Sequence, residues 1–249
     1  RFARIYGVSR GIYYGVFHSI SAFNNAGFDL VGNYQNLTPF VSDPVINLAI
    51  MGLIVFGGLG FTVIYDISSH WSFRKLSLHS KVVLTVTGLL LSVGFWAFLF
   101  LENSNPNTLG SLSPIGKVLA AAFQSVTTRT AGFNTIDLSK MTSSSQFLML
   151  LLMFIGASPG STGGGIKTTT FASITMMLYT VISSKEDVEV YERRIPRDVI
   201  FKAVAIAVVS MILVFSSVFL LTISEDAHIF PLLFEAVSAF ATVGLSLGI

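Results

Sequence analysis

The sequence contains no cysteine, and only 11% of its 249 residues are charged. The lack of cysteine excludes disulfides, thiolate metal sites and thiol catalysis within this chain. Hydrophobic residues make up 52% of the sequence and the mean hydropathy is +0.73. These values lie outside the range of soluble domains. We therefore predict an all-α integral membrane protein.

Uncharged runs at 44–65, 82–101 and 203–224 are long enough to span a bilayer as helices. Crossing about 30 Å of hydrocarbon requires about 20 apolar residues. A fourth apolar stretch, 141–184, carries one charge, Lys167, and is too long for a single span.

Basic side chains indicate the orientation of these spans. Loops 66–81 and 185–202 hold eight of the fifteen lysines and arginines, so the positive-inside rule places both loops in the cytoplasm. This topology requires 114–133 and 230–248 to enter the membrane from outside and return. Three arginines do not follow the rule, because the same topology puts them outside: Arg1, Arg4 and Arg10.

One short pattern occurs three times, at 17–28, 123–133 and 234–245. Each copy opens with a phenylalanine and has a glycine nine or ten residues later, within a turn of small residues. We interpret each copy as a short helix followed by a re-entrant turn. The expected helices lie near 12–24, 114–127 and 230–241.

The three turns are predicted to bind a dehydrated cation. Irregular backbone at membrane depth is tolerated only where protein buries it or water lines it. Carbonyl oxygens in such a turn can replace the hydration shell of an ion, and glycine permits the required dihedral angles. The alternative is that these glycines merely pack helices. A single copy would favour that alternative, whereas three copies favour a filter. The predicted filter residues are Asn25, Ala26, Gly27, Phe28, Thr130, Ala131, Gly132, Phe133, Thr242, Val243, Gly244 and Leu245.

A helix over 143–183 would be about 60 Å long at 1.5 Å per residue, so it must be interrupted. The interruption combines a proline with glycines and small hydroxyl residues. We predict a gate loop there, with a passive packing kink as the alternative. Lys167 is either an electrostatic barrier below the filter or a lysine that extends to the membrane surface. The predicted gate residues are Gly156, Ala157, Ser158, Pro159, Gly160, Ser161, Thr162, Gly163, Gly164, Gly165 and Lys167.

The same loop superficially resembles a phosphate-binding loop. That motif requires a lysine directly after its last glycine, and here Ile166 intervenes. The four histidines are scattered along the chain. We therefore do not expect an enzyme.

The segments 21–28, 126–134, 156–168 and 238–245 together resemble the Trk/Ktr/HKT superfamily of potassium transporters, and most closely the membrane subunits of bacterial Ktr systems. The resemblance implies four span–hairpin–span repeats around one central pore in the bacterial cytoplasmic membrane. It further implies a homodimer, potassium ions at the filter carbonyls, and a cytoplasmic nucleotide-binding regulatory ring of the KtrA type. No organic cofactor in this chain and no nucleic acid partner are expected.

By the same resemblance, the chain divides into three parts. Residues 1–66 correspond to the second half of repeat 2, 67–184 to repeat 3 with its broken helix, and 185–249 to the first half of repeat 4. The expected function is passive potassium translocation, gated by the glycine-rich loop under the control of the cytoplasmic subunit. A coupled carrier for sodium or mixed cations, or a non-conducting structural membrane subunit, remains the alternative.

Overall fold

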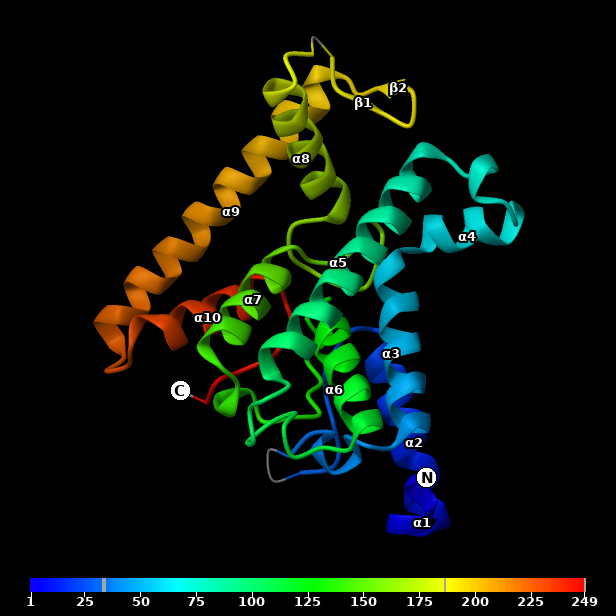
Figure 1. Ribbon diagram of the computed structural model, residues 1–249, viewed down its shortest axis with the longest axis vertical. Helices are drawn as coiled ribbons and strands as arrows, with labels where there is room; N and C mark the ends of the chain where they lie inside the picture. Colours follow the sequence, from blue (N-terminus) through cyan, green and yellow to red (C-terminus); the bar gives the residue numbers. More distant parts are fainter. Residues whose placement is uncertain (33–34, 186, 249) are drawn as a thin grey trace.

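The computed structural model describes residues 1–32, 35–185 and 187–248, and these are mainly helical (Figure 1). Their elements, in chain order, are α1 (Phe2–Tyr6), α2 (Val8–Phe23), η1 (Thr38–Phe40), α3 (Pro44–Leu59), α4 (Phe61–Ser69), η2 (Phe73–Lys75), α5 (Leu78–Glu102), α6 (Pro114–Thr127), η3 (Leu138–Lys140), α7 (Ser143–Phe154), α8 (Thr168–Ile182), β1 (Glu189–Val190), β2 (Arg193–Arg194), α9 (Arg197–Ser224) and α10 (Ile229–Phe240).

Within the described residues, α5 and α9 are each long and apolar enough to cross a membrane, as the predicted membrane class requires. The prediction of one continuous span over 44–65 is wrong. Helix α3 ends at Leu59, and α4 leaves it at an angle of 96° (Figure 1). The bend lies at Gly60, whose φ of 92° interrupts the helix, and the next backbone N–H, of Phe61, donates to Gly160 of a distant loop.

The three short helices lie close to where the sequence pattern predicts them. Helix α6 begins at Pro114, preceded by Ser113, whose hydroxyl accepts from the backbone N–H of Gly116. Helix α2 begins four residues earlier than expected, at Val8. The predicted broken helix consists of α7 and α8, which are separated by residues 155–167.

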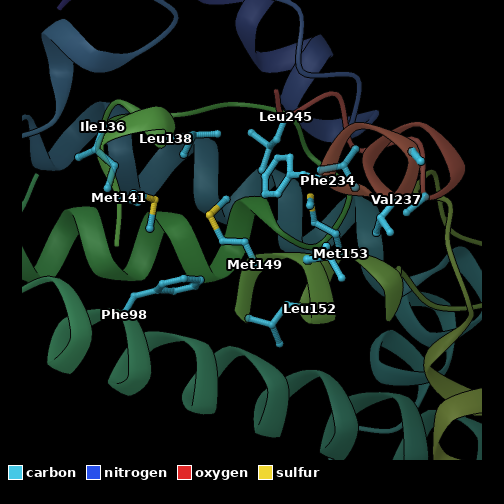
Figure 2. Close-up of a cluster of buried hydrophobic side chains, with 14 of the residues drawn as sticks. Phe98, Ile136, Leu138, Met141, Met149, Leu152, Met153, Phe234, Val237 and Leu245 are labelled. Carbon is cyan, nitrogen blue, oxygen red and sulfur yellow. The ribbon is translucent and has the colours of Figure 1, made fainter. Parts of the chain in front are cut away.

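The main hydrophobic core joins α5, α7 and α10 to the last of the three turns. Phe98 of α5, Met149 and Met153 of α7, Phe234 of α10 and Leu245 all point into this cluster (Figure 2). Each is at most 2% exposed. The third turn is thus fixed by packing against the helix that leads into the predicted gate loop.

The two basic loops lie at one end of the molecule, as the predicted topology requires (Figure 1). The predicted connector 184–198, of which Glu186 lies outside the described residues, contains the β1–β2 hairpin. Tyr191 at the hairpin tip shares a hydrogen bond of 2.6 Å with Thr85 of α5, and its ring packs edge-on against Phe73. The hairpin therefore braces α8 and α9 against α5.

A buried carboxylate joins α5 to α7 at the other end of α5. Glu102 is fully buried and accepts from both the backbone N–H and the hydroxyl of Thr142, at 2.8 and 2.7 Å. Its second oxygen accepts from Thr108 at 2.5 Å and from Asn105 at 2.7 Å. Because Thr142 caps α7, this acid fixes where α7 begins.

We predict that Glu102→Gln lowers the stability of the fold. The substitution replaces one acceptor oxygen with an amide donor that faces other donors, and an unsatisfied buried donor costs about 1–3 kcal/mol. Thermal unfolding of the purified protein in detergent should show a lower midpoint. Glu225→Gln, at an exposed acid after α9, is the control and should leave the midpoint unchanged. Equal unfolding midpoints for the two variants would contradict the role of Glu102 in joining α5 to α7.

Candidate functional site

The three predicted filter turns share one backbone conformation. The first residue of each turn has a left-handed φ, and so does the glycine two positions later. The first residues are Asn25 (51°), Thr130 (64°) and Thr242 (54°), and the glycines are Gly27 (73°), Gly132 (80°) and Gly244 (84°). A β-branched residue at positive φ is strained and persists only where its surroundings enforce it. The recurrence of this conformation marks the turns as equivalent pieces of one site.

Each turn is anchored to the end of its own short helix. The N–H of Ala26 donates to Ser21 O at 2.9 Å, and the N–H of Val243 donates to Ser238 O at 2.8 Å, in each case five residues back. The hydroxyl of Ser21 also donates to Phe28 O at 2.8 Å, beyond the glycine. The helix ends are thereby capped, and the chain after the glycine is held beside the helix.

The glycines of the three turns meet one another. A Cβ atom at Gly27 would lie 2.8 Å from the Cα of Gly132, and one at Gly132 would lie 2.3 Å from Val243 O. A Cβ at Gly244 would lie 3.9 Å from the Cα of Gly132. Segments more than 100 residues apart in sequence thus come together, with no room for a side chain at Gly27 or Gly132.

A cavity of about 560 Å³ opens beside the glycines. It is lined by the glycine ends of the turns and by two acids, Asp29 and Asp137. Asp29 accepts from the backbone of Val31 at 2.8 Å. The hydroxyl of Ser139 and the ion pair with Lys140 hold the pKa of Asp137 below its usual range. Asp137 was not expected as a site residue, because only the fold brings its loop over the turns.

The predicted gate loop crosses the opposite end of the turns. The hydroxyl of Thr162 donates to Asn25 Oδ1 at 2.9 Å, with Phe23 O at 3.2 Å. The next two loop residues pass the two threonines of the other turns. A Cβ at Gly163 would lie 2.0 Å from Thr130 Oγ1, and one at Gly164 would lie 2.3 Å from Thr242 Oγ1. Three consecutive loop residues therefore each contact the first residue of a different turn.

The loop itself is a folded unit. Residues at its two ends pair as a parallel bridge between Ile155 and Ile166, and the N–H of Ala157 donates to Gly164 O at 3.1 Å. The ammonium group of Lys167 donates to Gly163 O at 2.6 Å. The positive charge of Lys167 is thus held at the loop, close to the turns, and does not extend away from it.

Arg129 is a site residue that the sequence pattern did not single out. Its side chain is 4% exposed, and its Nη1 donates at 3.0 Å to the carbonyl of Ile155, where the gate loop begins. Its own carbonyl accepts from Asn25 Nδ2 at 2.9 Å. The available signal was an arginine inside a turn motif flanked by uncharged residues.

Glu235 supports the third turn from its short helix. Its Oε1 accepts from the hydroxyl of Ser246 and from the N–H of Leu247, both at 2.8 Å. The acid therefore acts on the segment after the glycine and lies outside the turn itself. The three turns contain no carboxylate.

The chain matches known proteins over nearly its whole length. Residues 2–249 match the family model TrkH, described as a cation transport protein. The chain is 46% identical over 245 residues to the Ktr system potassium uptake protein B of Vibrio alginolyticus, covering 98% of this chain and 53% of the relative. It is 44% identical to the protein of the same name from Bacillus subtilis, covering 98% and 54%.

Two further comparisons cover a similar share. The potassium/sodium uptake protein NtpJ of Enterococcus hirae is 37% identical, covering 98% of this chain and 54% of the relative. The crystal structure of the potassium transporter TrkH from Vibrio parahaemolyticus has the same fold, with a TM-score of 0.72 at 20% identity over 94% of this chain and 52% of that chain. The chain spans about half the length of the curated relatives it matches.

These matches confirm the resemblance to the Trk/Ktr superfamily and the classification as a multi-pass membrane protein rather than an enzyme. The chain belongs to the TrkH family of cation transport proteins.

Proposed function

We propose that this chain supplies three walls of a filter through which potassium ions cross the cytoplasmic membrane. The observation that carries the proposal is the meeting, at Gly27, Gly132 and Gly244, of three turns with the same pattern of left-handed φ angles. The names of the relatives, which describe potassium uptake, support the choice of ion.

The chemistry of the turns suits rapid passage. With no carboxylate in the turns, an ion would be bound by carbonyl dipoles and by the C-terminal ends of α2, α6 and α10, each with roughly half a negative charge. Binding by dipoles is strong enough to replace water and weak enough to release the ion. The acids at the cavity would raise the local cation concentration.

Residues 156–167 act in this proposal as a gate. The loop contacts the first residue of every turn, so an ion leaving the filter on that side would meet the loop and the ammonium of Lys167. A cytoplasmic nucleotide-binding subunit of the KtrA type would move the loop, and two copies of the membrane subunit would form a homodimer. The Ktr system names of two relatives support a multi-component assembly.

A second candidate function is uptake of sodium or of both ions. It is favoured by the name of the Enterococcus hirae relative, a potassium/sodium uptake protein. Rubidium and sodium fluxes through the reconstituted full-length protein distinguish the two, and strict sodium dependence with saturation at a low rate would favour a coupled carrier. The absence of cation flux would favour a structural subunit.

We predict that Gly132→Gln abolishes potassium uptake or its selectivity. Gly132 has a φ of 80°, and an added Cβ would lie 2.3 Å from Val243 O. Uptake should fall at least about tenfold, which corresponds to only about 1.4 kcal/mol. Growth of a potassium-uptake-deficient strain on limiting potassium gives the measurement. Gly32→Gln is the matched control, because Gly32 has a φ of 83° and no atom of the described residues beyond its chain neighbours lies within 4 Å of an added Cβ. Normal, selective uptake by Gly132→Gln would reject the filter assignment.

Deletion of residues 158–164 should raise rubidium flux severalfold in reconstituted vesicles. The deletion removes the three residues that contact the turns, so a barrier at that end of the filter is lost. Flux should be compared at equal amounts of inserted protein. An unchanged or lower flux would count against a gate and in favour of a passive kink.

Asp29→Asn should reduce rubidium uptake about twofold at low ionic strength. The carboxylate attracts cations to the cavity, and this attraction is screened at about 1 M salt, where the Debye length is about 3 Å. The difference from the wild type should therefore disappear in high salt. Asp226→Asn, in an exposed loop, is the control. A salt-independent reduction would indicate a structural role for Asp29.

A further inference from the structure

The bend between α3 and α4 leaves backbone groups that a continuous helix would pair. In an α-helix each carbonyl accepts from the N–H four residues later. Gly57 O would accept from Phe61, and Gly58 O would accept from Thr62. The turn at Gly60, with its φ of 92°, prevents this pairing.

The gate loop supplies the missing partners. The N–H of Thr162 donates to Gly57 O at 3.3 Å, and the N–H of Ser158 donates to Gly58 O at 3.0 Å. In return the N–H of Phe61 donates to the loop carbonyl of Gly160 at 3.1 Å. Each of these three backbone groups at the bend therefore has a hydrogen-bond partner in the loop.

The approach is close enough to depend on glycine. A Cβ at Gly60 would lie 2.5 Å from Pro159 O, which is backbone of the loop. A Cβ at Gly58 would lie 3.9 Å from the Cβ of Ala157, an ordinary contact. The loop thus lies directly against the bend.

The sequence is also compatible with a straight helix over the same residues. Residues 44–65 carry no charge, and residues 45–69 contain no proline. A continuous helix over 44–69 would be about 39 Å long, enough to cross the hydrocarbon core. As it stands, α3 covers only about 24 Å with its sixteen residues.

We propose that the gate loop and a straight α3–α4 helix are alternative partners for the same backbone groups. This inference rests on the proposed role of 156–167 as a gate. When the loop leaves the filter, Gly57 O, Gly58 O and the N–H of Phe61 lose their partners, and unpaired groups are costly at membrane depth. Straightening at Gly60 pairs Gly57 O with Phe61 again. Gate opening in one repeat is thereby coupled to the shape of a helix in another.

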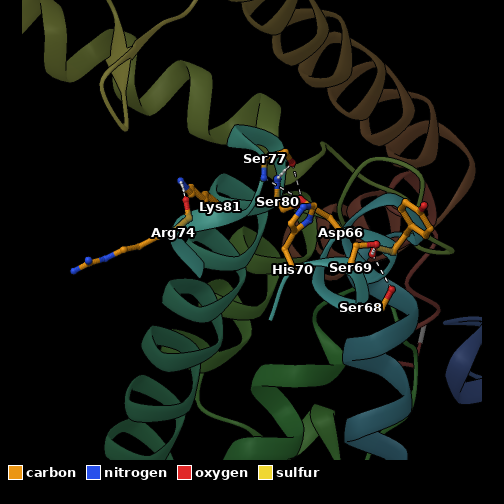
Figure 3. Close-up of polar contacts among 9 residues, drawn as sticks. Asp66, Ser68, Ser69, His70, Arg74, Ser77, Ser80 and Lys81 are labelled. Atoms are coloured by element: carbon orange, nitrogen blue, oxygen red, sulfur yellow. Dashed lines mark hydrogen bonds and ion pairs between the residues drawn. The ribbon is translucent and has the colours of Figure 1, made fainter. Parts of the chain in front are cut away.

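The far end of α4 carries this change to the cytoplasmic surface. Asp66 accepts from the N–H of Ser77 at 2.9 Å and pairs with His70 at 3.1 Å, which joins α4 to the start of α5 (Figure 3). The ammonium group of Lys81 in α5 donates to the carbonyl of Arg74, which lies between α4 and α5. Straightening of α4 must therefore displace the basic segment 70–77, where a cytoplasmic partner could sense or drive it.

The first experiment measures the bend. Spin labels at Leu48 and Tyr65, both exposed, report the distance between α3 and α4 in the full-length protein in nanodiscs. Deleting 158–164 should lengthen this distance by about 6 Å, from helix geometry and the 96° bend. An unchanged distance after the deletion overturns the proposal, whether or not the protein conducts.

Gly60→Ala tests the coupling without removing the loop. Alanine should shift the equilibrium toward the straight helix by at least about fivefold, so both the distance and the rubidium flux should rise. Gly52→Ala in the middle of α3, where an added Cβ has open space, should change neither. A longer spin-label distance without added flux, or added flux without a longer distance, contradicts the proposal that the loop and the straight helix are alternative partners.

A disulfide provides a test that does not depend on the folding of Gly60→Ala. This chain has no cysteine, and the Cβ separation of 3.9 Å between positions 58 and 157 suits a disulfide. Gly58→Cys with Ala157→Cys, any other cysteines being replaced, should conduct when reduced and stop conducting when oxidised. Neither single variant should respond to oxidant.

The outcomes separate this inference from the proposed function. Flux that persists after mass spectrometry has verified the disulfide, or failure of the disulfide to form, overturns the inference. Absence of flux in the wild type and in the reduced protein rejects the proposed conduction. In that case the spin-label distance still decides whether the loop holds the bend.

Discussion

The structure depends on one constraint, that backbone polar groups at membrane depth must have partners. Helices meet this constraint along their length, and the irregular segments meet it through bonds to helix ends, within themselves and to one another. The loop after α7 pairs with the bend at Gly60, and it pairs with itself through Ala157 and Gly164. The interruption between α3 and α4 is thus matched to the interruption between α7 and α8.

The three glycine turns meet the same constraint in a different way. Their helix-end carbonyls are capped by the turn N–H groups, as at Ser21 and Ser238. The left-handed first residues of the turns are held in place by these bonds. Glycine is needed where the turns approach most closely, because Gly132 lies between Gly27 and Val243.

Sequence reasoning located the turns and the break after 154, because both have local signals. Glycines at a fixed distance from a phenylalanine, and a proline with glycines inside an overlong apolar run, can be recognised without tertiary information. Helix α6 starts where Ser113 and Pro114 predict it. The division of the chain into repeats remains a prediction.

Other features could not be predicted, because they depend on pairs of residues far apart in sequence. No proline lies at the bend, and the uncharged run around Gly60 is long enough to predict a single span. The hydrogen-bond partners at the break come from the loop backbone at Ser158, Gly160 and Thr162, a hundred residues later. The links from Asn25 to Arg129 and to Thr162 likewise join segments 104 and 137 residues apart. The glycines at 57, 58 and 60 receive the loop, a contact for which the local sequence has no signal.

The loop between α7 and α8 follows only one of the three turns along the chain but contacts all three, and this explains where the turns differ. Asn25 stands where the other two turns have threonines, and its amide carries both an acceptor oxygen and a donor nitrogen. Its oxygen accepts from Thr162, and its nitrogen donates to Arg129 O. The loop residues next to Thr130 and Thr242 are Gly163 and Gly164, because the two hydroxyls occupy the space that a side chain would need. The consecutive glycines of the loop and the asparagine of the first turn are therefore two consequences of the same asymmetric contact.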